Sequence, residues 1–223
     1  MSREQLLKKE KFDFNDLCEI IDILRAPDGC PWDREQDHKS IRKGLIEETY
    51  EVVEGIDKQD NNIMCEELGD LLMQVVFHAA IGRDERAFDI NDICTGVCRK
   101  LIYRHPHVFS DVSVADSGEV LKNWDELKKK EKGQKSSADV LQSVSRALPS
   151  LMRAQKLSKK SMEHVDLDSV CDEMISQINS LKTDPDSKTA GRLLFNIARL
   201  GNIENYDLEN VLYDENEEFC RKY

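Results

Sequence analysis

Two adjacent segments with helical periodicity and a short connection constrain the fold more than any other feature of this sequence. Apolar residues recur at helical spacing over residues 40–57 and again over residues 63–82. The polar residues 57–62 that join them leave room for a tight turn only. Two long amphipathic helices connected this closely must run antiparallel, and the pattern therefore predicts a helical hairpin.

The rest of the chain repeats the helical pattern, and no segment alternates as a strand would. Further helices are expected at 14–24, from Asp89 or Asn91 to about Tyr103, and at 117–132, 145–161, 168–182, 187–200 and 207–221. The polar stretch 133–144 resembles a linker. The predicted fold class is all-α: a helical-bundle module over 14–132 that contains the hairpin, a linker over 133–144, and a second helical module over 145–223.

The charge balance excludes several classes of partner. The net charge of −12 provides no basic field for nucleic acid or an anionic membrane. The seven cysteines are an odd number without regular spacing, the first residues form no apolar signal region, and no apolar run approaches the length of a membrane span. We therefore expect a cytoplasmic protein that binds neither membrane nor nucleic acid.

Two pairs of carboxylates stand out on the predicted hairpin. Glu48 and Glu51 are three residues apart on the first helix and Glu67 and Asp70 on the second, so each pair shares one stripe beside apolar residues. Converging carboxylates repel unless something compensates their charge, and all-oxygen ligation suits Mg²⁺, with Mn²⁺ as the alternative. Either pair alone is typical of a solvated helix face; matched spacing on a hairpin favours a metal site.

Glycines on the same two segments predict where the helices approach each other. Gly44 and Gly55 share the acidic stripe of the first helix, and we expect Gly69 on the second to allow a neighbouring backbone to come close. Glu47 falls on the side of its stripe away from the apolar residues.

Residues 14–161 resemble the MazG-type nucleoside triphosphate pyrophosphohydrolases. The motif EExxE followed by ExxD is shared by a wider all-α superfamily, whereas CPWD and HPHVF are narrower and argue against specialised relatives that act on dCTP or phosphoribosyl-ATP. The matching strings are GCPWDREQDHKS (29–40), LIEETYEVVE (45–54), EELGDLLMQVVFHA (66–79), RHPHVF (104–109), NWDELKKKE (123–131) and ALPSLMRAQKL (147–157).

The resemblance implies a reaction and a set of residues. Such enzymes cleave a nucleoside triphosphate between the α and β phosphates, giving a nucleoside monophosphate and pyrophosphate by attack of a metal-activated water. The family's metal ligands correspond to Glu48, Glu51, Glu67 and Asp70. Glu47 and Glu48 are assigned to catalysis, and which carboxylate accepts the water's proton stays open.

Four further residues are candidates for binding the substrate. Lys100 and Arg104 share a face of one predicted helix, and Trp124 and Lys128 repeat that spacing on the next. In similar proteins these helices close the nucleotide pocket, where an aromatic ring stacks on the base and cations reach phosphate. Trp124 is equally well explained as a packing residue, and Lys128 belongs to a lysine run that is mostly solvated.

The second half is similar to a degenerate copy of the first. Where the first copy has Glu51, Glu67 and Asp70, the second has Ser176, Thr189 and Arg192, and only Glu173 remains of the expected ligands. A positive Arg192 opposes cation binding. We expect a structural or dimerising module there and a homodimer overall, since one hairpin alone buries little surface. The alternative function is a nucleotide-binding or dimerising scaffold with weak or no catalysis.

Overall fold

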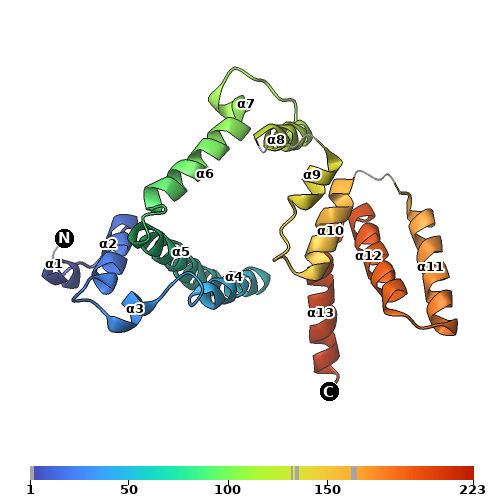
Figure 1. Ribbon diagram of the computed structural model, residues 1–223, viewed down its shortest axis with the longest axis horizontal. Helices are drawn as coiled ribbons and strands as arrows, with labels where there is room; N and C mark the ends of the chain where they lie inside the picture. The colour runs from blue at the N-terminus through green and yellow to red at the C-terminus, as the bar shows by residue number, and fades with distance from the viewer. Residues whose placement is uncertain (1–2, 132, 134–135, 162–164) are drawn as a thin grey trace. The chain divides into compact units, whose positions relative to one another are not determined.

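The computed structural model describes residues 3–131, 133, 136–161 and 165–223. Every regular element in these residues is a helix, which confirms the all-α prediction (Figure 1). The chain divides into two compact units, Met1–Ser113 and Val114–Tyr223. Within the described residues, no helix combines the length and apolarity that a bilayer span requires.

The first unit is built around the expected hairpin. Helices α4 and α5 pack against each other, and α2 packs against α5 (Figure 1). The helices of this unit are α1 (Arg3–Leu7), α2 (Phe14–Arg25), α3 (Pro31–Glu35), α4 (Arg42–Asp57), α5 (Asn61–Asp84), α6 (Ile90–Arg104) and α7 (Pro106–Phe109).

Local signals explain the tight turn of the hairpin. The N–H of Gln59 donates to the carbonyl of Ile56 and the N–H of Asp60 to that of Gly55, both at 3.0 Å, with Gln59 in the left-handed region at φ 53°. This pattern ends α4 in the manner of a Schellman motif. Asp60 then caps α5, because its side chain accepts from the N–H groups of Asn62 and Ile63.

The close approach of α4 and α5 is made by Gly55 and Gly44. A Cβ atom on Gly55 would lie 2.8 Å from the backbone nitrogen of Met64, and one on Gly44 would lie 2.7 Å from the side-chain amide of Gln74. Our expectation for Gly69 was wrong, because nothing lies within 4 Å of the corresponding position there. Gly69 is on the exposed side of α5.

The core of the first unit lies toward the C-terminal half of α5. The buried residues Ile21 of α2, Ile41 at the start of α4, and Val76, Phe77 and Ile81 of α5 belong to one cluster. The acidic half of the hairpin therefore extends beyond the core, and its carboxylates remain partly accessible.

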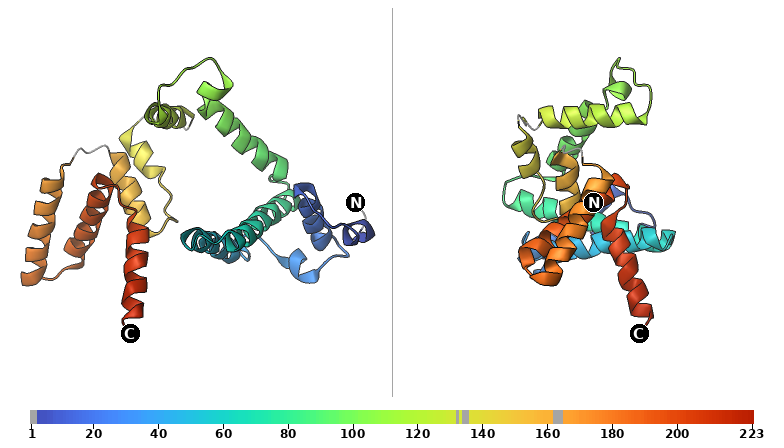
Figure 2. Two further views of the ribbon diagram at one scale, coloured as in Figure 1. Left: turned by 180° about the vertical axis from the view of Figure 1, so that it is seen from behind. Right: turned by 90° about the vertical axis from the view of Figure 1, so that its right-hand side faces the viewer.

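The second unit contains another helical hairpin. Helices α11 and α12 pack against each other, α10 packs on α12, and α13 contacts α10 and then projects away from it (Figures 1 and 2). The helices of this unit are α8 (Ser117–Glu131), α9 (Ser137–Gln142), α10 (Ser150–Ser161), α11 (Leu167–Thr183), α12 (Ser187–Ile203) and α13 (Leu208–Arg221).

The long helices match the expected ranges within a few residues, whereas the short ones were not expected. Helices α3 and α7 begin at Pro31 and Pro106, and α9 lies inside the expected linker 133–144. Residue 132 of the predicted first module and residues 134 and 135 of that linker lie outside the described residues. Helix α8, expected in the module 14–132, groups with the second unit by its contacts; the module boundaries themselves stay a prediction.

Gly55 and Gly69 are expected to respond in opposite ways to alanine. Gly55→Ala forces the backbones of α4 and α5 apart and should cost about 1–3 kcal/mol, which lowers the midpoint of thermal unfolding by several degrees. Gly69→Ala meets no neighbour and should add about 0.5–1 kcal/mol through helix propensity. Calorimetry of the two variants checks this, and equal shifts would show that the hairpin does not need the close approach.

Candidate metal centre

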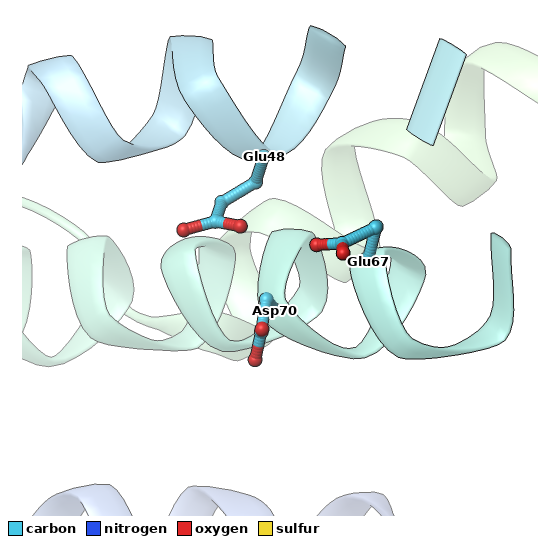
Figure 3. Close-up of side chains that lie close together, drawn as sticks. All are labelled: Glu48, Glu67 and Asp70. Atoms are coloured by element: carbon cyan, nitrogen blue, oxygen red, sulfur yellow. The ribbon is translucent and has the colours of Figure 1, made fainter. Parts of the chain in front are cut away.

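Three carboxylates meet where α4 crosses the N-terminal half of α5. Glu48 of α4 and Glu67 and Asp70 of α5 each offer one oxygen, and these oxygens lie within 4.8 Å of one another. Figure 3 shows Glu48 reaching from α4 toward α5, with Glu67 turned toward it and Asp70 on the adjoining turn. All three side chains are half-buried. The structure thus brings together three of the four residues that the sequence proposed as metal ligands.

The electrostatics of this group reflect mutual repulsion. Burial raises the pKa of Glu48, and the charges of Asp70, Glu51 and Glu67 raise it further. Burial likewise raises the pKa of Glu67, followed by the charges of Glu51, Glu66 and Asp70. Both shifts mean that the ionised form is disfavoured in the absence of a compensating cation.

Glu51 and Glu47 lie outside the group of three converging carboxylates. Glu51 is exposed and is not among the three converging residues, but its charge acts on both Glu48 and Glu67. The exposed Glu47 carboxylate pairs with Lys43 at 2.6 Å, one turn earlier on α4. Their assignments as ligand and catalytic residue stay predictions.

The donor set fits a hard divalent cation. Its three members are all carboxylates, they come from two helices held at close range, and their repulsion is relieved by positive charge. Partial exposure leaves positions for water and for phosphate oxygens. Neither histidine nor cysteine belongs to this group among the described residues, so its chemistry favours Mg²⁺ or Mn²⁺ over zinc.

The candidate substrate-binding residues lie on α6 and α8. Lys100 and Arg104 occupy the C-terminal turns of α6, which leads away from α5 (Figure 1). Trp124 and Lys128 are half-buried on α8, which belongs to the second unit. Their role in holding a nucleotide stays a prediction.

In the second unit an internal cation pairs with the one carboxylate that remains of the expected ligands. The Glu173 carboxylate accepts a hydrogen bond from the Asn196 amide at 3.0 Å, and the Arg199 guanidinium lies 3.6 Å from the same oxygen. Asn196 is buried, and its own oxygen accepts from Arg199 at 3.3 Å. Sequence comparison singled out Arg192, but Arg199 is the cation that contacts the remaining carboxylate. No second group of carboxylates like that of the first unit occurs among the described residues.

The structure is an all-α fold with a carboxylate cluster between two antiparallel helices, a donor set that fits a divalent cation. Comparison with known proteins makes the class more specific. The family described as "MazG nucleotide pyrophosphohydrolase domain" matches residues 36–109, a range that includes all of α4 and α5.

Relatives match over most of the chain. A Thermotoga maritima protein named nucleoside triphosphate pyrophosphohydrolase/pyrophosphatase MazG is 37% identical over 218 residues, which are 94% of this chain and 84% of that protein. An Escherichia coli nucleoside triphosphate pyrophosphohydrolase is 38% identical over 221 residues, 93% of this chain and 84% of that protein. Bacillus subtilis YabN is 48% identical over 156 residues, 69% of this chain but 32% of that protein.

The chain belongs to the MazG family of nucleotide pyrophosphohydrolases, a family of hydrolases. A solved structure described as a mazG-related protein from Thermotoga maritima is 30% identical and covers 52% of this chain and 98% of its own, with a TM-score of 0.45. The family assignment depends on the sequence relatives and not on this superposition.

The raised pKa of Glu48 predicts an unusual gain of stability on neutralising it. The pKa of Glu48 in the folded protein is raised above its ordinary value of 4.5. Such a carboxyl group contributes to stability below pH 4.5, where it is protonated, and this contribution is lost as the pH rises through the pKa of the folded protein. Glu48→Gln should therefore raise the unfolding midpoint of the metal-free protein at pH 7.5, and the gain should shrink toward pH 4.5.

Glu173→Gln is the matched control in the second hairpin. Its carboxylate faces Arg199 and Asn196, so removing the charge should lower the midpoint at pH 7.5. Thermal unfolding in the presence of a chelator measures both variants. A fall in midpoint for Glu48→Gln would show that the three carboxylates do not strain the metal-free hairpin.

Proposed function

We propose that this chain hydrolyses nucleoside triphosphates to nucleoside monophosphates and pyrophosphate, with Mg²⁺ held by Glu48, Glu67 and Asp70 and assisted by Glu51. The observation that carries the proposal is the convergence of three carboxylates within 4.8 Å on the hairpin that the family match covers. Relatives aligned over most of the chain carry the name nucleoside triphosphate pyrophosphohydrolase.

The residues of the hairpin have separable tasks in this reaction. When bound, the cation neutralises phosphate oxygens and lowers the pKa of a coordinated water. The attacking water loses a proton to a carboxylate oxygen of Glu47 or Glu48 as its oxygen bonds to the α phosphorus, and the bond to the β phosphate breaks to release pyrophosphate. Lys43 pairs with the exposed Glu47 carboxylate at 2.6 Å, one turn earlier on α4.

Binding of the nucleotide needs cations, because the chain carries a net charge of −12. Besides the metal, Lys100 and Arg104 on α6 are the basic residues that we assign to the phosphates. We assign Trp124 to stacking on the base and Lys128 to a phosphate, both from α8.

Loss of the carboxylate group should abolish pyrophosphate release. Removing metal ligands forfeits several kcal/mol of transition-state stabilisation, so the double variant Glu48→Gln, Asp70→Asn should lose about 100-fold or more in rate. Release of pyrophosphate from a panel of NTPs and dNTPs with Mg²⁺ measures this and also defines base and sugar preference.

Glu54→Gln is the control on the same helix. Glu54 is exposed and pairs with Lys58, so this variant should keep the wild-type rate within about twofold, as expected for a surface ion pair. Undiminished release by the double variant would overturn the site. Nucleotide binding without product by the wild-type protein would instead support the alternative, a nucleotide-binding scaffold.

We also propose that two copies of the chain pair through the outer face of the hairpin. Exposed apolar residues, each more than a third accessible, lie on both helices of the hairpin and define this outer face: Ile46, Tyr50 and Val53 at helical spacing on α4, and Leu68 and Leu72 on α5. Helix α4 buries only Val52 and Gly55 of its sixteen residues. A second hairpin on this face completes a four-helix bundle and covers the exposed stripe on both copies.

A charge on the outer face should separate the dimer. In a two-fold interface Tyr50→Lys introduces the lysine twice, at a cost of several kcal/mol, or about 100-fold or more in the dissociation constant. Sedimentation velocity measures this, with Val97→Lys on α6 as a control at another exposed apolar residue. A monomeric wild-type protein, or equal effects of both variants, would contradict the proposed interface.

A further inference from the structure

A row of side chains on α5 contacts α4 and the segment before it at successive turns. Asp70, Gln74 and His78 are four residues apart and face Glu48, Gly44 and His38 in turn. The first contact belongs to the carboxylate group and the second is the close approach at Gly44. The third contact is a hydrogen bond between two imidazoles, and neither the motif nor the proposed chemistry accounts for it.

The geometry of this third contact is specific. The Nδ1 atoms of His38 and His78 are 2.8 Å apart, and their rings stack with centroids 5.1 Å apart at an angle of 15°. The ring of Phe88 stacks on His38 from 5.8 Å. A contact of 2.8 Å between two Nδ1 atoms requires a proton on one and a lone pair on the other.

The surroundings decide which histidine donates. His38 directs Nε2 toward a Glu85 carboxylate oxygen 3.7 Å away, which favours a proton on that nitrogen and leaves the His38 Nδ1 as acceptor. The Nε2 of His78 is buried, and no described residue bonds to it. Because buried N–H groups are rarely left unpaired, His78 is best placed as the neutral tautomer that donates from Nδ1.

The pair fixes the segment that leads into α4. Ile41 occupies the N-cap position of α4 without any side-chain hydrogen bond to the helix. The turn before it is closed locally by the Asp37 carboxylate, which accepts from the N–H groups of Lys39 and Ser40 at 2.8 Å, and tertiary contacts attach this turn to the rest of the unit. Arg25 of α2 holds the preceding loop by donating to the carbonyls of Asp33 at 2.6 Å and Gln36 at 3.2 Å. The His38–His78 hydrogen bond then attaches the chain to α5 directly before Ile41.

We propose that His38 and His78 are positioning residues for the metal-binding carboxylates, because the single proton between their imidazoles fixes the register in which Glu48 faces Glu67 and Asp70. This inference rests on the proposed function for its catalytic consequence, but metal binding tests it independently. The contact lies two turns along α5 from Asp70, so a shift there moves α4 as a rigid helix and misplaces Glu48.

Protonation should release this contact. Burial lowers the pKa of His78 below its ordinary 6.5, and the nearby His38 lowers it further. A histidine with a depressed folded pKa contributes stability that is fully present above about 6.5 and is lost as the pH falls toward the folded pKa. Glu85 lies 3.7 Å from the Nε2 of His38. Arg25 bonds to the carbonyl of Gln36, two residues before His38, and is itself paired with Asp84 at 2.9 Å.

Two substitutions of His78 separate hydrogen bonding from packing and from titration. His78→Phe keeps a ring but removes the donor, and should weaken Mn²⁺ binding at pH 7.5 by about 10-fold or more, as for other residues that orient metal ligands. His78→Asn supplies an amide donor near the Nδ1 position that does not titrate. It should bind Mn²⁺ within about threefold of wild type and retain its affinity from pH 7.5 to 5.5 better than wild type does.

The measurements are Mn²⁺ titration and pyrophosphate release by the full chain, with circular dichroism as a check of folding and His107→Phe as a control histidine. His38→Phe should weaken Mn²⁺ binding as much as His78→Phe does. The double variant should bind Mn²⁺ as well as either single variant, because both substitutions remove the same contact. Unchanged Mn²⁺ affinity in His78→Phe overturns the inference, and so does equal weakening in His78→Asn. A wild-type protein that binds Mn²⁺ but releases no pyrophosphate counts against the proposed function alone.

Discussion

The like charges of Glu48, Glu67 and Asp70 repel one another across the contact between α4 and α5, and the first unit is arranged to hold them there. The glycine approach at Gly55, the capped turn at Asp60 and the packing of α2 on the far half of α5 each fix the hairpin against that repulsion. The raised pKa values of Glu48 and Glu67 are the electrostatic consequence. A bound cation would relieve this repulsion, which is the basis of the proposed metal site.

In the second hairpin, the charge of a carboxylate is balanced by side chains of the same hairpin. Glu173 meets the guanidinium of Arg199 and the amide of Asn196, so its charge is balanced without an external ion. The two hairpins share a helical pattern and differ in the source of positive charge. The first unit therefore keeps the unbalanced carboxylates on which the proposed metal centre depends, whereas the described residues of the second unit hold no such group.

Sequence reasoning was most successful where periodicity is long. The hairpin and its three converging carboxylates followed from apolar spacing over 40–57 and 63–82. Helices α3, α7 and α9 are too short for periodicity to show, although the Ser136 and Asp139 capping box at α9 was a usable signal. The expected close approach at Gly69 was wrong, because the sequence pattern of one helix does not show which of its sides packs against the neighbouring helix.

Contacts between residues far apart in the sequence were beyond such reasoning. Nothing local to His38 indicates that it meets His78 forty positions later, and Arg199 lies one helix away from the carboxylate that it neutralises. These contacts depend on how helices are placed after they form. The predicted roles of Lys100, Arg104, Trp124 and Lys128 in nucleotide binding depend on the same kind of information.

The attachment of α13 has a consequence for how the chain opens. Leu208 packs under Gly201, and Gln155 of α10 bonds to the backbone at Tyr206 and Leu208, so the helix is anchored at its first turn. Beyond this turn Val211, Leu212 and Phe219 are about half exposed. Amide hydrogens there are protected mainly by the helix itself and should exchange by fraying from the C-terminal end, well before those of α4 and α5.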